Sequence, residues 1–257
     1  MSQRLTMLIA CHRPCPVPED RCYLPVEAGA ALHRAPIPGF TPDDTGDNIS
    51  SRNGCFCELT ALYWAWKNRS ADDLGLVHYR RYFSDGKWWR PKFARILTGE
   101  ALSRALADCD ILLPRPRRYW IETNYSQYAH AHHGADLDAT REILKERHPD
   151  YVAAFDAVMA RTWGHRFNMF VMGRKKCDEY CAWLFDVLFA LEKRLDIRAY
   201  SPYDRRVFGF VAERLLDVWL ETKGYPCREL PYVFTEKQNW VKKGGAFLMR
   251  KMGIRAR

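Results

Sequence analysis

The sequence predicts a single α/β domain with a mostly parallel central sheet flanked by helices. Short apolar runs typical of strands recur along the chain and alternate with segments of helical period. The chain has 257 residues, of which 47% are hydrophobic and 28% are charged, a balance typical of globular proteins. This balance excludes disordered and fibrous architectures, and no apolar run reaches the ~20 residues of a membrane-spanning helix.

The strands and helices of this domain are predicted from hydrophobic spacing. We expect strands in the apolar runs at residues 5–10, 74–77, 111–113, 167–172 and 232–234. Apolar residues spaced three and four apart predict helices with buried faces at 59–66, 177–191 and 207–219. Between the first two strands, residues 13–53 are rich in Pro, Gly and Asp, and we expect a long irregular connection there.

Capping residues indicate where two of the helices begin. Ser201 and Asp204 fit a capping box before the helix over 207–219, which is expected to end near Gly224. A further helix is expected through residues 140–147, with Asp136 or Asp138 as its cap.

Basic side chains follow each of the first three predicted strands. His12 follows the first, residues 78–81 follow the second, and a cluster of arginines at 115–118 follows the third. The carboxyl ends of parallel strands meet at one edge of a sheet, where α/β proteins bind their ligands. The sequence therefore predicts an anionic ligand at this edge, held by arginines, with solvated loop charges as the alternative. Of Arg80 and Arg81, one is expected to bind the ligand and the other to pair with a carboxylate.

Residues 122–138 combine hydroxyl, amide, acidic and aromatic side chains with three histidines. Many neutral hydrogen bonds and aromatic faces suit the recognition of a sugar. The histidines also invite a zinc interpretation, but their spacing matches no helical pair of zinc ligands. Asp204 is the first candidate for a general base and Asp136 the second, although each also suits a helix start.

Several chemical motifs are missing from the sequence. There is no dinucleotide-binding glycine motif, P-loop, nucleophile elbow or zincin helix. The acidic triplet Asp108-Cys109-Asp110 precedes the third strand and so falls at the wrong end of the sheet, and no metal site is predicted. The nine cysteines include no CxxC pair and are expected to be structural or redox-silent. No signal peptide is recognisable, so we expect a cytoplasmic protein.

The net charge of +9 is concentrated at the end of the chain. Residues 237–257 contain seven Lys or Arg and no Asp or Glu, and we treat them as a basic tail after a domain of residues 1–236. Aromatic and aliphatic residues among these charges suit peripheral contact with an anionic membrane. A nucleic-acid partner is the rival interpretation, but no nucleic-acid-binding motif supports it.

Longer motifs resemble one bacterial family over nearly the whole chain. They lie at residues 47–50, 57–68, 75–83, 122–125, 164–170, 203–210 and 236–240. This family belongs to capsular, exopolysaccharide and O-antigen gene clusters and was long described only as a domain of unknown function. Its characterised members are β-galactofuranosyltransferases.

The resemblance implies a GT-A-like fold, a UDP-galactofuranose donor and transfer with inversion to a lipid-linked glycan at the inner face of the cell membrane. Another UDP-hexose, galactopyranose or glucose, is the alternative donor. In GT-A enzymes the strand end that carries the metal-binding DxD corresponds here to residues 78–81. We therefore expect that no cofactor is required, with arginine and histidine supplying the positive charge instead of a divalent metal.

The expected contacts fall into two groups. Those with the donor are His12, Asn48, His78, Tyr79, Arg80, Arg81, His165, Arg166, Asn168 and Lys237. Those with the acceptor are Asn124, Tyr125, Gln127, His132 and His133.

Overall fold

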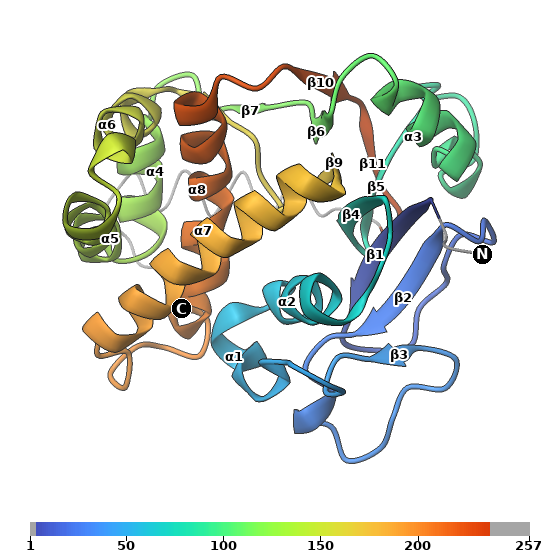
Figure 1. The fold of residues 1–257 in the computed structure, drawn as a ribbon, viewed down its shortest axis with the longest axis horizontal. Helices are drawn as coiled ribbons and strands as arrows, with labels where there is room; N and C mark the ends of the chain where they lie inside the picture. Colours follow the sequence, from blue (N-terminus) through green and yellow to red (C-terminus); the bar gives the residue numbers. More distant parts are fainter. Residues whose placement is uncertain (1–3, 237–257) are drawn as a thin grey trace.

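A nine-stranded mixed sheet forms the centre of the protein, of which a computed structural model describes residues 4–236 (Figure 1). Its strands are β1 (Leu5–Cys11), β2 (Tyr23–Glu27), β3 (Thr41–Pro42), β4 (Asp73–His78), β5 (Arg81–Phe83), β6 (Ile111–Pro114), β9 (Phe170–Gly173), β10 (Cys227–Leu230) and β11 (Tyr232–Phe234). Two further short strands, β7 (Arg117–Arg118) and β8 (Trp163–Gly164), pair with each other outside this sheet.

The strand order in the main sheet is β10-β6-β9-β4-β1-β2-β3, and β5 joins β4 to β11. β1 pairs in parallel with β2 and β4, and β6 pairs in parallel with β10. β9 runs antiparallel to both of its neighbours, β4 and β6. The mostly parallel sheet predicted from the sequence is thus confirmed, with a reversal at β9. The carboxyl ends of β1, β4 and β6 consequently lie at the same edge.

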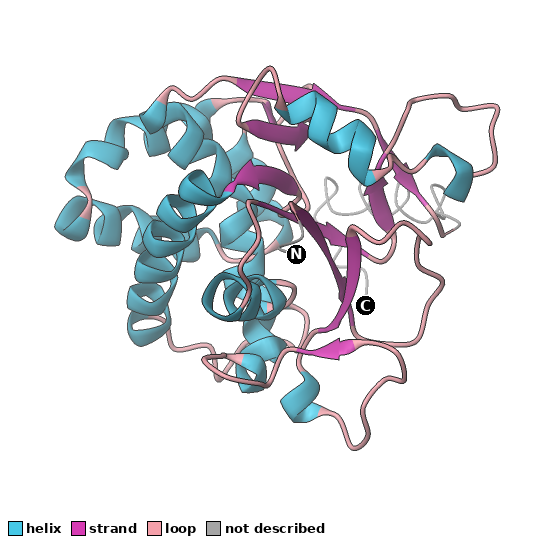
Figure 2. Ribbon diagram, turned by 45° about the vertical axis from the view of Figure 1, so that its right-hand side comes forward, coloured by secondary structure: helices cyan, strands magenta, loops and turns pink. Residues whose placement is uncertain are grey.

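The sheet has a hydrophobic core on each face. All seven residues of β1 are buried, and alternate side chains enter opposite cores because successive side chains of a strand point to opposite faces. Leu8 and Ala10 pack toward the larger core beneath the long helices, whereas Met7 and Ile9 pack toward the smaller one, which includes Leu102. Figure 2 shows most of the helices gathered on one side of the strands.

Eight α-helices and five 3₁₀ helices are described in residues 4–236. The α-helices are α1 (Asn53–Phe56), α2 (Leu59–Asn68), α3 (Gly99–Leu106), α4 (Asn124–Ala131), α5 (Gly134–Arg147), α6 (Val152–Ala160), α7 (Arg174–Arg194) and α8 (Val207–Lys223). The 3₁₀ helices are η1 (Ala30–Leu32), η2 (Ser50–Arg52), η3 (Phe93–Arg95), η4 (Pro149–Tyr151) and η5 (Asp204–Arg206). No helix in this part of the chain has the length and apolarity needed to span a bilayer.

The three amphipathic helices predicted from the sequence are confirmed as α2, α7 and α8. The expected end of α8 is confirmed as well, because Gly224 follows it in the left-handed conformation with φ of 63°. The predicted connection over residues 13–53 is mostly irregular but also contains β2 and β3.

Two segments differ from the sequence prediction. The strand expected at 167–172 begins only at Phe170, because Phe167 and Asn168 adopt positive φ angles of 80° and 52° that no strand accommodates. Much of residues 122–138 is helical instead of forming a sugar-binding loop. Thr123 and Ser126 form a capping box that starts α4, and α5 begins at Gly134, with no Asp at its N-cap.

Candidate active site

A cavity of about 380 Å³ opens at the carboxyl ends of β1 and β4. It lies where the sequence predicts an anionic ligand, at the edge of the sheet where parallel strands end. Its lining comes from both strand ends, from the turn between α1 and α2, and from the segment that enters α8. The lining residues are Ala10, Cys11, His12, Ala28, Asn53, Gly54, Cys57, Glu58, His78, Arg80, Pro202 and Arg206.

Polar atoms around this cavity lack hydrogen-bond partners within the described residues. They are Nδ1 of His78, Nε of Arg80 and Oδ1 of Asn168, each buried. Asn168 does not line the cavity itself but contacts Glu58, which does. Buried polar groups in proteins are normally hydrogen-bonded, so the unpaired atoms of His78 and Arg80, two lining residues, favour a polar ligand at this cavity.

The two histidines of the cavity are neutral at physiological pH. Burial, followed by the charges of Arg81 and Arg80, lowers the pKa of His78 to about 2. Burial and the charge of Arg80 also lower the pKa of His12, whose Nε2 lies 3.2 Å from the Tyr79 hydroxyl. The positive charge of the cavity therefore comes from its arginines, whereas the histidines offer neutral hydrogen-bonding groups.

Two arginines approach the cavity from distant parts of the chain. Arg80 follows β4, and its guanidinium packs over the Tyr79 ring at 5.0 Å. Arg206, from η5, donates to the Cys57 sulfur at 3.1 Å and packs over Phe210. Such guanidinium groups match the oxygens of a phosphate, and two of them suit a diphosphate.

Arg81, at the start of β5, does not line the cavity, whereas Arg80 in the preceding turn does. Its guanidinium stacks over the Phe167 ring at 4.2 Å. Burial lowers its pKa, and the neighbouring carboxylates of Glu213 and Glu58 oppose that effect. Arg81 accordingly supports the wall of the site from behind.

Glu58 is a carboxylate at the cavity that the sequence analysis did not select. Asn168 donates to it at 2.9 Å, and burial raises its pKa despite this hydrogen bond. Cys57, Phe167 and Asn168 are three of the four non-glycine residues with positive φ in residues 4–236, and all three lie beside Glu58 or its partner. Strained backbone of this kind collects at functional sites.

Asp204 itself does not line the cavity, but Pro202 and Arg206, two positions away on either side, do. Ser201 donates to its carboxylate at 2.7 Å, and the Asp204 backbone N–H donates to the Ser201 hydroxyl at 3.1 Å. The predicted capping box is wrong in its full form, because Tyr203 precedes η5 and Arg206 precedes α8 as N-caps without a side-chain cap. Burial alone raises the pKa of Asp204, but hydrogen bonds from Ser201 and His132 outweigh it and hold the pKa below its usual value. The carboxylate is therefore ionised at neutral pH.

Two of the five predicted acceptor residues lie beside Asp204. His132 Nδ1 is 3.4 Å and His133 Nε2 is 3.8 Å from its carboxylate oxygens. The His132 ring stacks on Phe210 at 4.1 Å and on Tyr203 at 5.5 Å, and burial lowers its pKa to about 4. His133 is half-exposed and reaches solvent next to this aromatic cluster.

Asp136, the second candidate base, is only 1% exposed. Each of its carboxylate oxygens accepts a hydrogen bond from a tyrosine, Tyr128 at 2.9 Å and Tyr200 at 2.7 Å. An acceptor hydroxyl has no access to this carboxylate. Asp136 therefore ties α5 to its neighbours, and the geometry favours Asp204 as the base.

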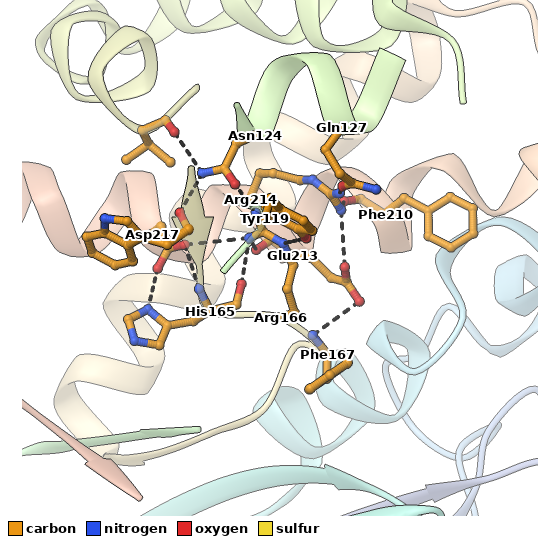
Figure 3. A network of polar contacts seen from close by, with 12 residues as sticks. Tyr119, Asn124, Gln127, His165, Arg166, Phe167, Phe210, Glu213, Arg214 and Asp217 are labelled. Atoms are coloured by element: carbon orange, nitrogen blue, oxygen red, sulfur yellow. Dashed lines mark hydrogen bonds and ion pairs between the residues drawn. The ribbon is translucent and has the colours of Figure 1, made fainter. Parts of the chain in front are cut away.

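Three further predicted residues lie in a buried network instead of the cavity (Figure 3). His165 places Nδ1 2.5 Å from Asp217 of α8, and Arg166 donates to the side chain of Asn124. Asn124 also donates to the Val158 carbonyl at 2.8 Å. Protein groups satisfy these side chains, so the structure places all three away from the cavity lining.

The remaining predicted residues are also placed outside the cavity lining. Asn48 bonds the backbone of its own loop, Tyr125 donates to Asp138, and Gln127 accepts from Arg214. Lys237 lies outside the described residues. Of the sequence-predicted donor residues, the structure thus brings His12, His78 and Arg80 into the cavity, with Tyr79 and Asn168 directly behind it.

A central sheet flanked by helices, with its cavity at the strand ends, defines a GT-A-like α/β fold. The family model described as a domain of unknown function, DUF4422, matches residues 6–224. The chain belongs to this family. No curated protein sequence gives a significant match.

A solved structure, the bifunctional glycosyltransferase WbbM in its apo form, resembles the chain with a TM-score of 0.83 and 29% sequence identity. The match covers 91% of this chain and 45% of the other, so the chain spans about half the length of that protein. The fold class expected from the sequence is confirmed by this likeness, and the resemblance to a glycosyltransferase family is supported.

Proposed function

We propose that the protein is a glycosyltransferase that uses a UDP-sugar donor and a glycan acceptor. The observation that carries this proposal is the cavity at the ends of β1 and β4, which Arg80 and Arg206 line together with the neutral histidines His12 and His78. Its volume of about 380 Å³ falls in the range of small-ligand sites. The likeness to WbbM supports the same reaction class.

The donor sugar in this proposal is galactofuranose, transferred with inversion to a lipid-linked glycan of a bacterial surface polysaccharide. Its support is the similarity of the motifs at residues 57–68, 75–83 and 203–210 to the β-galactofuranosyltransferases. Transfer of galactopyranose or glucose is the alternative within the same class. The proposal also includes peripheral membrane contact through the basic tail, residues 237–257. The tail lies outside the described residues.

The mechanism follows from the positions of Asp204 and the arginines. The acceptor hydroxyl oxygen forms a bond to the anomeric carbon while the bond from that carbon to the diphosphate oxygen breaks. Asp204 takes the hydroxyl proton as general base, and Arg80 and Arg206 stabilise the negative charge on the departing UDP.

The cavity residues do not fit a divalent metal of the kind that GT-A enzymes bind through a DxD motif. The end of β4 presents His78 and Arg80 where that motif would supply carboxylates, and Glu58 is the single carboxylate of the described lining. No group of three His, Cys, Asp or Glu in residues 4–236 is arranged to hold a metal ion. We therefore propose that arginine charge supports the leaving group without a required cofactor.

The test is incubation of the full chain with UDP-galactofuranose, UDP-galactopyranose or UDP-glucose and a synthetic lipid-linked acceptor. We expect a β-linked product from UDP-galactofuranose. A product from another donor alone overturns the choice of sugar but keeps the class. Absence of UDP binding together with salt-sensitive polynucleotide binding overturns the class.

A matched pair of variants tests the site itself. Arg80→Gln removes a charged donor from the cavity and should weaken UDP binding by about 10- to 100-fold. Arg118→Gln removes an exposed arginine after a different strand and should leave the Kd for UDP unchanged. Equal effects of the two substitutions would show that general charge, and not this cavity, binds the nucleotide.

A further inference from the structure

The loop between β5 and α3 exposes large aromatic side chains. Trp88 is 78% exposed and Trp89 67% exposed, and Phe93 of η3 is 40% exposed. The two indole rings lie 6.1 Å apart with an edge-on arrangement. Burying such side chains is strongly favourable, so an exposed cluster of them marks a surface that meets another apolar phase.

The same loop is basic and closed at its base. Residues 85–95 contain Lys87, Arg90, Lys92 and Arg95 with a single acid, Asp85, which pairs with Arg90 at 2.8 Å. A backbone hydrogen bond from Asp85 to Arg95 closes the loop at 2.9 Å. The tryptophans are therefore presented on a compact projection with surplus positive charge.

This loop adjoins the point where the basic tail begins. Lys92 Nζ donates to the backbone carbonyls of Thr235 and Glu236, at 3.1 Å each. Glu236 is the last described residue, and the 21 residues that follow carry seven Lys or Arg and no acid. The Glu236 carboxylate pairs with Arg13 at 2.5 Å and approaches Arg80 of the cavity at 3.9 Å. The exposed tryptophans, the tail origin and the cavity mouth are thus linked by direct contacts.

We propose that the loop of residues 85–95 is a membrane-docking surface, on which Trp88 and Trp89 enter the headgroup region of a bilayer that carries anionic lipids. Tryptophan is enriched at membrane–water interfaces because its ring is apolar and its N–H is polar. Lysine and arginine beside it are attracted to anionic headgroups, and the seven charges of the adjoining tail add to that attraction. The positive charge around the two tryptophans favours an anionic lipid surface over an uncharged apolar protein partner.

The experiment is co-sedimentation of the full chain with vesicles of phosphatidylcholine alone or with phosphatidylglycerol added, without donor or acceptor. We expect binding to the anionic vesicles, and a loss of about 10- to 100-fold in the partition coefficient for Trp88→Ala/Trp89→Ala. Trp88→Phe/Trp89→Phe should restore much of the binding. The matched control is Trp120→Ala/Ile121→Ala, which removes a second exposed apolar pair, after β7, and should bind as the unaltered chain does.

Brominated lipids provide a second readout, because they quench only tryptophans within the bilayer. We expect quenching in the unaltered chain and weaker quenching in Trp88→Ala/Trp89→Ala, in which Trp240 of the tail remains, with unchanged circular dichroism in both. Unchanged vesicle binding in this variant, or an equal loss in the Trp120→Ala/Ile121→Ala control, would overturn the proposal. Failure of all forms to bind vesicles would also overturn it, whatever the result for sugar transfer. Binding of a protein through this loop without vesicle binding would point to a protein interface instead.

Discussion

The His132 imidazole lies 3.4 Å from the carboxylate of Asp204, a residue 72 positions further along the chain. This pair joins the C-terminal end of α4 to η5, the turn that leads into α8 and contributes Arg206 to the cavity. Ser201 donates to the same carboxylate, so two neutral or weakly basic groups fix its direction while leaving it ionised. The arrangement suits a base that must accept a proton from an incoming hydroxyl.

Asp204→Asn should lower kcat by about 10²- to 10⁴-fold, because the amide cannot accept the acceptor proton. The Kd for UDP should stay nearly unchanged, since the arginines of the cavity remain. The control is Ser201→Ala, which removes the hydrogen bonds between Ser201 and Asp204 but leaves the carboxylate, and should cost about 1 kcal/mol of stability while keeping most of the turnover. Retained turnover in Asp204→Asn, at lowered stability, would assign Asp204 to capping alone.

Binding of a UDP-sugar should be nearly independent of pH between about pH 7 and 8. The pKa of His78 is lowered to about 2 and that of His12 is lowered from its ordinary value of 6.5, so both rings are neutral over this range. The arginines keep their charge throughout. Calorimetric titration at several pH values checks this expectation. A Kd that rises about tenfold per pH unit would instead mean that a protonated histidine holds the diphosphate.

Transfer should persist after exhaustive chelation of divalent cations. The cavity presents arginines and neutral histidines where a metal-dependent transferase would present carboxylates. Turnover is to be measured on chelated protein with and without added Mn²⁺ or Mg²⁺. Complete loss of turnover that either ion restores would contradict the prediction.

His165→Gln should destabilise the protein most at mildly acidic pH. Burial alone lowers the pKa of His165, but the Asp217 and Glu229 carboxylates outweigh it and raise the pKa above its usual value. A histidine whose pKa is raised in the folded state stabilises the protein fully below about pH 6.5. This stabilisation is lost as the pH rises through the folded-state pKa. Breaking such a buried pair costs about 3 kcal/mol or more.

The measurement is the difference in unfolding free energy between the unaltered chain and His165→Gln, which should shrink from pH 6 toward pH 9. The Kd for UDP serves as the control and should not change, because His165 is buried against Asp217 of α8. A weakened Kd with unchanged stability would restore the donor contact that the sequence predicts.

The sequence was sufficient to locate the cavity but not to complete its lining. His12, His78 and Arg80 follow apolar runs, and the rule that parallel strands end at one edge is enough to bring them together. Glu58 and Arg206 reach the same cavity only through the docking of helices far apart in sequence. In the sequence, Glu58 looks like an ordinary helix start. Arg206 lies in the same motif as Asp204, and the motif was interpreted through the carboxylate alone.

The partners of polar residues in apolar surroundings were the hardest feature to predict from the sequence. Arg166 and Asn124 look like ligand contacts in the sequence, since nothing local reveals whether a polar side chain meets a ligand or another part of the protein. Arg166 donates to Asn124, and Asn124 donates to the Val158 carbonyl. Both partners come from segments tens of positions away in the sequence. The positive φ of Asn168, which ends the predicted strand early, is likewise tied to its contacts with Glu58 and the Gly209 carbonyl.

β9 joins two groups of strands that are made at different times during synthesis. β4 pairs with it on one side and β6 on the other, so residues 73–76 of β4 have no partner along this edge until Phe170–Gly173 is synthesised. An unpaired edge on a buried, apolar strand is a template for association with other chains. Completion of the sheet therefore waits for a late segment, and its non-local pairings govern the folding rate. A nascent chain halted before Phe170 is accordingly the form most prone to aggregation.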